Sequence, residues 1–235
     1  MLKQVYTDIA GGLIRNNEAH NNTIKEYWSV LLRDVKTNPS HWKGKIGFDY
    51  GLGGGRNIIN LLRMANFERV DGCDIVQEIL DGAKKNIKKA GFQENRFRLY
   101  LTSGETLNGI ADNTYDFAMF CAVLHHIPVY DIRYKILKDM YRIMKKDGLF
   151  CFQMVMDSKE FAANTPHHRY PAHGYYANYV DAKDTNGTCD VNLEDPEFMR
   201  KDLESIGFAN VTYDVCPSPW TSREFWVYFR CTKNG

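Results

Sequence analysis

The chain of 235 residues lacks the features that mark membrane-spanning, secreted and zinc-binding proteins. Its longest apolar run, over residues 117–124, is far too short to cross a bilayer. The first residues show no basic segment followed by an apolar core, so no signal peptide is indicated. The six cysteines contain no C-x-x-C pair, which argues against a zinc knuckle, and several fall in expected strands, as free thiols do in a reducing compartment. We therefore expect a cytoplasmic protein.

An excess of one charge is also missing. Lys and Arg together number 30 and Asp and Glu 29, for a formal net charge of +1. A nearly neutral chain has no electrostatic footprint for nucleic acid or for an anionic membrane, so we expect a small-molecule partner instead. The length is sufficient for one sizeable domain with its own core, and no pattern indicates the oligomeric state.

A glycine-rich turn at residues 45–57 is the most informative stretch that is present. A short apolar segment ends on Asp49, breaks into four glycines and continues as a helical pattern. Glycines admit positive φ angles and close ligand approach, and the free N–H groups of the following helix suit an anionic group. The dinucleotide pattern G-x-G-x-x-G fits poorly, because its third place falls on Arg56. This mismatch disfavours a nicotinamide oxidoreductase.

Strand and helix patterns alternate four times after this point, which predicts right-handed crossovers and a doubly wound parallel α/β sheet. In such sheets ligands bind at the carboxyl ends of the strands. The expected strands cover residues 46–49, 69–74, 97–102, 113–121 and 149–154, with two closing strands at 210–215 and 224–229.

The turn itself matches the pattern D-x-G-x-G-x-G in full, through Asp49, Gly51, Gly53 and Gly55. This pattern resembles motif I of the class I S-adenosylmethionine-dependent methyltransferases. The run from Val70 to Ile75 also resembles that family. The resemblance implies a Rossmann-like methyltransferase fold, with a mostly parallel seven-stranded sheet and a C-terminal antiparallel hairpin. It further implies an enzyme that transfers a methyl group from S-adenosylmethionine to a small molecule.

Asp74 is the candidate ribose ligand. It ends the second expected strand, 19 residues after Gly55, close to the interval of about 20 typical of a ribose-binding acid. The alternative is a cap for the helix that follows. Many relatives have an aspartate where Ser103 stands, so the resemblance leaves the adenine contact open between Ser103 and Glu105. The full set of cofactor candidates is Asp49, Gly51, Gly53, Asp74, Ile75, Ser103, Gly104, Glu105 and Cys121.

The chain divides into an N-terminal helical extension or cover, residues 1–44, and a methyltransferase domain, residues 45–235. Residues 1–22 are polar, and we expect irregular structure or a weak helix there. Thr23 to Glu26 has the form of a capping box, and an apolar stripe continues to Val35. This second helix either packs on the sheet or covers the cofactor.

Residues 155–194 interrupt the alternation with a long, polar and aromatic segment. Loops of this length in compact domains are usually functional, and we interpret this one as an inserted cap over the acceptor site. Its histidines and acids have no regular ligand spacing, so we expect no metal site. The substrate-binding candidates in the cap are His167, His168, Arg169, Tyr175 and Tyr176.

The acceptor decides whether a catalytic base is needed. A hydroxyl acceptor is helped by a general base, and the pKa of an unperturbed histidine suits that role. His126, His125 and His173 are the catalytic candidates. In relatives, a histidine pair after the fourth strand, like His125 and His126 here, also supports the cofactor pocket. The polar cap favours O-methylation of a sugar or sugar-like molecule. N-methylation of a small amine and a catalytically silent, cofactor-binding scaffold remain alternatives.

Overall fold

A computed structural model of the protein describes residues 2–15, 29–157, 168–170, 173, 175–178, 190–218, 222 and 224–234. The expected capping box at Thr23 to Glu26 and the substrate candidate His167 lie outside these residues. For the other four cap candidates, His168, Arg169, Tyr175 and Tyr176, the backbone is described but the side chains are not.

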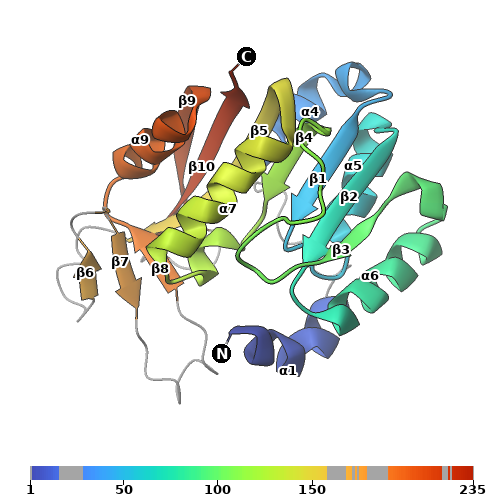
Figure 1. Cartoon of the computed structure of the whole chain (residues 1–235), viewed down its shortest axis with the longest axis horizontal. Coiled ribbons are helices and arrows are strands. Elements are labelled where there is room, and N and C mark those ends of the chain that lie inside the picture. The colour runs from blue at the N-terminus through green and yellow to red at the C-terminus, as the bar shows by residue number, and fades with distance from the viewer. Residues whose placement is uncertain are drawn as a thin grey trace.

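The centre of the fold is a twisted sheet in which parallel strands follow the order β3-β2-β1-β4-β5 (Figure 1). β5 then pairs antiparallel with β10, and β10 pairs antiparallel with β9, which is the predicted closing hairpin. The strands are β1 Ile46–Tyr50, β2 Arg69–Asp74, β3 Leu99–Leu101, β4 Tyr115–Phe120, β5 Met144–Asp157, β6 His168–Tyr170, β7 Tyr175–Asn178, β8 Asp190–Leu193, β9 Phe208–Pro217 and β10 Glu224–Lys233.

Seven of these strands form the predicted sheet, and the described chain adds three more strands to it. β6, β7 and β8 form an antiparallel ladder within the segment that the sequence analysis interpreted as a cap. β8 joins the main sheet by pairing parallel with β5 at Val155 and Met156, beyond the last β4 partner at Phe152. The ladder therefore extends the sheet past the carboxyl end of β4.

Helices cover both faces of the sheet. α7 and α9 pack on the face that carries Phe120, Phe150 and Phe229, whereas α4, α5 and α6 pack on the face that carries Phe117. The helices are α1 Leu2–Arg15, α4 Arg33–Thr37, α5 Arg56–Ala65, α6 Gln77–Lys89, α7 Tyr130–Ile143 and α9 Pro196–Ile206, with short 3-10 turns η1 Pro39–Trp42, η2 Glu94–Arg96 and η3 Leu124–His126.

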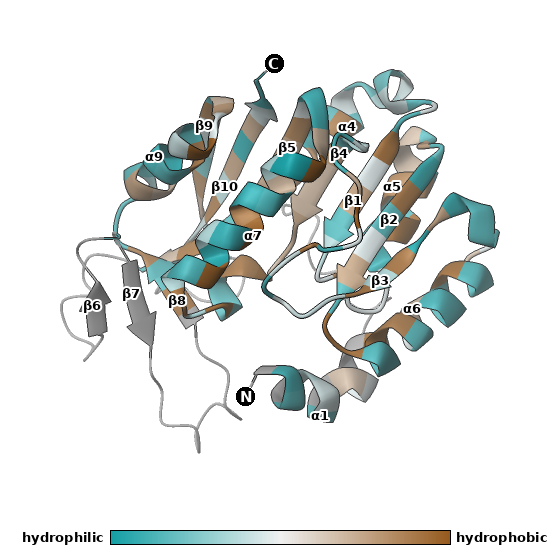
Figure 2. Ribbon diagram, viewed as in Figure 1, coloured by the Kyte–Doolittle hydropathy of each residue, from teal (hydrophilic) through white to brown (hydrophobic). Residues whose placement is uncertain are grey.

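Hydropathy explains this layering (Figure 2). α7 and α9 turn apolar stripes to the sheet and polar faces to solvent, while β4 is apolar along almost its whole length because both of its faces are covered. Asp195 caps α9 by accepting a hydrogen bond from the Glu197 N–H at 2.9 Å, and Gly207 ends the helix at φ 116°. No helix in the described ranges is long and apolar enough to cross a membrane.

The N-terminal segment differs from expectation. Residues 2–15 form a regular helix, α1, where irregular structure or a weak helix was expected. α1 lies across the start of α6, toward the carboxyl ends of β1 and β2 (Figure 1). In the described part of the second expected helix, Leu31, Leu32 and Val35 are fully buried against the sheet, so this part has the packing role.

Candidate functional site

The glycine turn follows β1 and has the geometry that its sequence predicted. Gly51, Gly53 and Gly55 have φ angles of 70°, 52° and 85°, which favour glycine. The Gly51 N–H donates to the Cys73 carbonyl at 2.9 Å, which holds the turn against β2. A Cβ at Gly51 would lie 2.5 Å from Val123, while one at Gly53 would meet nothing within 4 Å. Space is therefore tight on the β4 side of the turn and open beside Gly53.

Asp74 ends β2 with its carboxylate turned into this turn. One oxygen accepts hydrogen bonds from the backbone N–H groups of Ile75, at 2.7 Å, and Val76, at 3.2 Å. The other accepts from the Gly53 N–H at 3.3 Å. Burial raises the pKa of Asp74, and these three hydrogen bonds oppose the rise. The side chain thus joins the residues after β2 to the glycine turn, and it does not cap α6, whose N-cap Val76 has no side-chain hydrogen bond.

Asp49 lies under the turn on the other side and is completely buried. Its Oδ1 accepts a hydrogen bond from Asn57 Nδ2 at 3.2 Å, and no described group donates to its Oδ2. Burial raises the pKa of Asp49 to about 7, although the Asn57 hydrogen bond and the nearby Arg56 charge lower it in part. Arg56 reaches onward, with its guanidinium 3.5 Å from the Cys121 sulphur at the end of β4.

The residues that follow β3 lie close to the ends of β1 and β2. The Ser103 hydroxyl accepts a hydrogen bond from the Glu105 N–H at 3.2 Å, and Glu105 itself is exposed. Gly104 has a φ angle of 84°, and a Cβ there would lie 3.0 Å from Ile75. The Tyr50 hydroxyl donates to the Gly104 carbonyl at 3.4 Å, which joins the ends of β1 and β3. The predicted cofactor residues therefore gather at one edge of the sheet.

The two adjacent histidines occupy η3, just beyond β4. His125 is buried and His126 is half-buried, with their ring centroids 4.0 Å apart. The ring of Tyr6, on α1, meets His126 edge-on with a centroid distance of 6.3 Å. Among the residues that the structure describes, no three His, Cys, Asp or Glu side chains are grouped to hold a metal ion.

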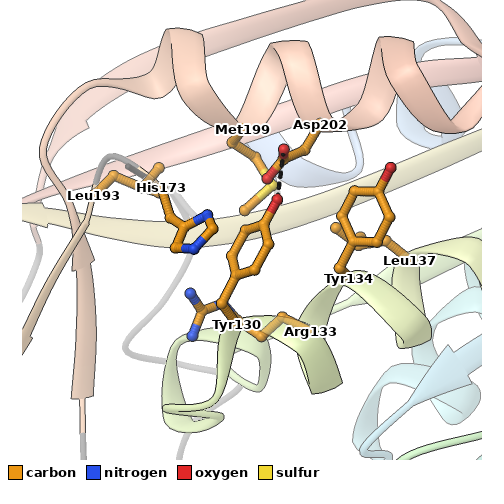
Figure 3. A pocket seen from close by; sticks show the side chains of 8 residues that line it. All are labelled: Tyr130, Arg133, Tyr134, Leu137, His173, Leu193, Met199 and Asp202. Carbon is orange, nitrogen blue, oxygen red and sulfur yellow. Dashed lines mark hydrogen bonds between the residues drawn. The ribbon is translucent and has the colours of Figure 1, made fainter. Parts of the chain in front are cut away.

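His173, the third histidine candidate, lies in a small pocket between α7, α9 and β8 (Figure 3). Its ring stacks on Tyr130 with centroids 3.8 Å apart, and the Tyr130 hydroxyl donates to Asp202 at 2.8 Å. Burial raises the pKa of Asp202, while the Tyr130 hydrogen bond and the His173 charge lower it. His173 thus contacts α7 through Tyr130. The sequence analysis did not predict this contact, because the residues of the cluster are far apart in sequence, with Tyr130 and Asp202 separated by 72 positions.

A buried polar group near the end of β5 was also missed. Gln153 interrupts an apolar strand and is fully buried, and its Nε2 donates to the Met154 carbonyl at 3.2 Å. Asn192, on β8, donates from Nδ2 to Asp157 at 2.6 Å. Nothing in the described ranges donates to Gln153 Oε1 or Asn192 Oδ1. Polar residues inside the apolar pattern of β5 were the signal for this group.

The residues present fit a nucleoside with an attached amino acid. Gly53 leaves open space beside the Asp74 carboxylate. A ribose in that space would place its two hydroxyls next to this acceptor. The buried Asp49 Oδ2 offers an unused acceptor next to the same turn. These features agree with the expectation that the chain binds S-adenosylmethionine.

Comparison with known proteins supports the same assignment. Residues 48–152 match the family described as a methyltransferase domain. Over 105 residues the chain is 32% identical to a probable methyltransferase from Aspergillus luteorubrus, covering 43% of this chain and 36% of that protein. Over 180 residues it is 23% identical to an S-adenosyl-L-methionine-dependent Diels-Alderase from Neonectria sp. (strain DH2), covering 77% and 65%. The chain thus spans about one third and two thirds of these curated relatives.

A solved structure shows the fold. The Burkholderia thailandensis 1,6-didemethyltoxoflavin-N1-methyltransferase, with its substrate and S-adenosylhomocysteine bound, superposes with a TM-score of 0.60 at 17% identity. The match covers 99% of this chain and 91% of that one. Together with the family match, it confirms the Rossmann-like architecture and the cofactor class predicted from the glycine turn. Residues 48–152 of this chain thus match a methyltransferase domain, in agreement with the resemblance seen in the glycine turn.

Proposed function

We propose that the protein transfers a methyl group from S-adenosylmethionine to a hydroxyl of a small polar acceptor, most specifically of a sugar or sugar-like molecule. The observation that carries methyl transfer is the convergence of the glycine turn, Asp74 and the β3 end at one edge of a methyltransferase domain. The cofactor supplies an activated methyl group on a sulphonium. The protein therefore needs chiefly to align the acceptor and to exclude water.

The roles of the cofactor residues follow from their positions. Asp74 takes the ribose hydroxyls, and Gly51 and Gly53 let the backbone approach the ligand. Ile75 packs beside the nucleoside, and Ser103, Gly104 and Glu105 line its far end. Asp49 and Cys121 lie toward the reactive end, where Arg56 brings a positive charge within 3.5 Å of the Cys121 sulphur.

The acceptor lies, on this proposal, between η3 and the β6–β8 ladder, which begins where β4 ends. By strand register Arg169 pairs with Tyr176, and Tyr170 with Tyr175, so the cap candidates occupy neighbouring positions on one ladder. His126 is the preferred base because it is half-buried beyond the end of β4. His125 is more deeply buried, and His173 is stacked on Tyr130.

Product analysis tests this function. The protein would be incubated with isotopically labelled S-adenosylmethionine and panels of sugars, polyols and amines, and labelled products would be identified by mass spectrometry. O-methylated sugars support the proposal, whereas turnover of amines alone rejects the hydroxyl acceptor. His126→Asn should lower kcat for a hydroxyl acceptor by about 100-fold or more without changing cofactor affinity, because it removes the base. An unchanged kcat would reject the role of His126.

N-methylation is the second candidate, favoured by the structural likeness to an N1-methyltransferase. An amine that is already neutral needs no strong base. Histidine substitutions in η3 and in the cap would then leave turnover almost intact, and a pH profile would follow the titration of the amine itself.

Chemistry without methyl transfer is a third candidate, favoured by the 23% identity to a cofactor-dependent Diels-Alderase. The cofactor would then act as a bound structural group in a catalytically altered or silent scaffold. Calorimetry showing tight S-adenosylmethionine binding, combined with no methylated product from any acceptor class, would favour this reading over both methyl-transfer proposals.

We also propose that α1 covers the cofactor, the role that the sequence analysis gave to the N-terminal extension as a whole. Ala10 packs on Val76 and Ile79, next to Ile75, and Tyr6 contacts His126. Asn86 Nδ2 donates both to the Ile14 carbonyl, at 3.3 Å, and to the Gly54 carbonyl, at 3.0 Å. One amide therefore links the end of α1 to the glycine turn.

A further inference from the structure

The edge of β5 changes partner near its carboxyl end. Its pairing with β4 ends at Phe152, and its pairing with β8 begins at Val155. Gln153 and Met154 lie between the two ladders on that edge, and η3 contacts both β5 and β8. A break of this kind at the carboxyl ends of parallel strands is where an α/β sheet binds ligands.

Strand alternation places the polar side chains of this region on one face. Cys151, Gln153, Val155 and Asp157 are two residues apart in β5, so their side chains share a face of the sheet. Cys151, Val155 and Cys121 belong to one buried cluster, which fixes that face as the one carrying Cys121. Gln153 therefore lies on the same side as the predicted reactive end of the cofactor.

The two amide groups cannot satisfy their oxygens by turning over. Gln153 Nε2 faces the Met154 carbonyl, and Asn192 Nδ2 faces the Asp157 carboxylate. Exchanging nitrogen and oxygen in either amide would place two acceptors against each other. Both oxygens are consequently held away from these partners, buried and without a donor in the described part of the chain. Such groups are costly in a native protein, and each calls for an explanation.

We propose that Gln153 Oε1 and Asn192 Oδ1, beside the Asp157 carboxylate, form the recognition site for hydrogen-bond donors on the methyl acceptor. This inference rests on the proposed function and adds the groups that read the acceptor. Two buried oxygen acceptors without donors in the described part of the chain select a molecule rich in O–H or N–H groups and reject an apolar or fully alkylated one. The donors of the bound acceptor complete hydrogen bonds that the protein leaves open.

The experiment uses the full chain saturated with S-adenosylhomocysteine and measures probe binding by saturation-transfer NMR. The probes are methyl α-D-glucopyranoside, its tetra-O-methyl derivative, which lacks donors, and ethanolamine. We expect signals from the glucoside or from ethanolamine and none from the alkylated sugar. The glucoside alone identifies a hydroxyl acceptor, and ethanolamine alone identifies an amine.

Gln153→Met removes the amide at nearly constant volume. It should weaken probe binding by about tenfold and raise Tm by about 2–4 °C, because the buried oxygen without a donor is gone. Gln153→Glu, kept neutral by burial, retains a carbonyl oxygen and should retain binding. Tyr115→Phe, which removes a satisfied hydroxyl at the other end of the sheet, should also retain it.

The inference would be overturned by unchanged probe binding in Gln153→Met, or by no probe binding by wild-type protein that binds S-adenosylhomocysteine. A fall in Tm on Gln153→Met would likewise assign the amide to packing. Failure to bind S-adenosylhomocysteine at all, measured by calorimetry, would instead overturn the proposed function on which the inference rests.

Discussion

Polar side chains at the amino ends of the central strands have hydrogen-bond partners within the fold, whereas several nearer the carboxyl ends have atoms without one in the described residues. At the amino end, Asp71 accepts hydrogen bonds from Arg69 at 2.8 Å and from the Tyr115 hydroxyl at 3.0 Å. Asp116 accepts from Lys145 and from the Ile46 N–H. Asp71 accepts with both oxygens and Asp116 accepts twice with one oxygen, so these carboxylates support the fold at this end of the sheet.

At the carboxyl end the same type of group is left open. Asp49 Oδ2, Gln153 Oε1 and Asn192 Oδ1 are buried, and none has a hydrogen-bond partner within the described ranges. They lie in three different strands, β1, β5 and β8. This difference supports the proposal that ligands bind at the carboxyl ends of the strands.

The largest effect expected from this contrast is on the pH dependence of stability. The pKa of Asp49 is raised by burial from 3.8 to about 7 in the folded state. Between these values the folded state binds more protons than the unfolded state, so stability falls as pH rises and levels off above about pH 7. The shifted pKa of Asp49 thus changes the free energy of unfolding by on the order of 4 kcal/mol across this pH range. Urea unfolding between pH 4.5 and about 8 should show this decline.

Asp49→Asn removes the titrating group and should flatten that part of the profile. The asparagine also keeps an acceptor for Asn57, so the local packing is preserved. An identical decline in the wild-type protein and in the variant would show that the carboxyl is already ionised when the protein is folded.

A smaller loss is expected at Asp74. Asp74→Ala should weaken S-adenosylhomocysteine binding by about 1–3 kcal/mol, or about 5- to 150-fold, because ribose hydroxyls and the Gly53 N–H lose their acceptor. Isothermal calorimetry measures the change. Glu78→Ala, an exposed change on α6, is the control and should bind as the wild type does. Equal affinities for all three proteins would refute the ribose role.

Tyr115→Phe tests the structural end of the comparison. Removing the hydroxyl leaves one oxygen of Asp71 without its donor and should lower the free energy of unfolding by about 1–2 kcal/mol. Affinity for S-adenosylhomocysteine should not change. Weaker cofactor binding in this variant would contradict the view that the amino ends of the strands serve only the fold.

The smallest effect concerns α1. A Cβ at Gly82 would lie 2.5 Å from Ile14, so Gly82→Val should push α1 from α6 at a cost of about 1 kcal/mol. Stopped-flow fluorescence should then show S-adenosylhomocysteine dissociating about fivefold faster. Gly12→Ala, on α1 with nothing within 4 Å, is the matched control and should not accelerate release. Equal rates in both variants would remove the covering role of α1.

Local patterns were enough to predict the cofactor edge. Gly51, Gly53 and Asp74 are close in sequence and belong to one strand-turn-helix unit followed by the next strand, so their spacing alone brings them together. The closing hairpin and the cap of α9 were equally local, because Asp195 and Gly207 act on the helix that they flank.

The remainder depended on contacts that spacing cannot reveal. The ladder β6–β8 joins β5 only through a parallel pairing across more than 30 residues, and Tyr130 finds Asp202 across the α7–α9 interface. The regular helix α1 was expected only as a weak helix or irregular structure, because its sequence gives a weak helical signal. Its position depends on Gly82 of α6, where the missing Cβ leaves room for the Ile14 side chain. Gln153 was overlooked because an apolar strand was expected to bury only apolar side chains.

The most direct test is a crystal structure of the protein with S-adenosylhomocysteine bound. The account predicts the ligand across the carboxyl ends of β1, β2 and β4, with both ribose hydroxyls within hydrogen-bonding distance of Asp74 and its sulphur toward Cys121 and η3. A ligand bound elsewhere, or Asp74 still occupied only by the N–H groups of Gly53, Ile75 and Val76, would contradict it.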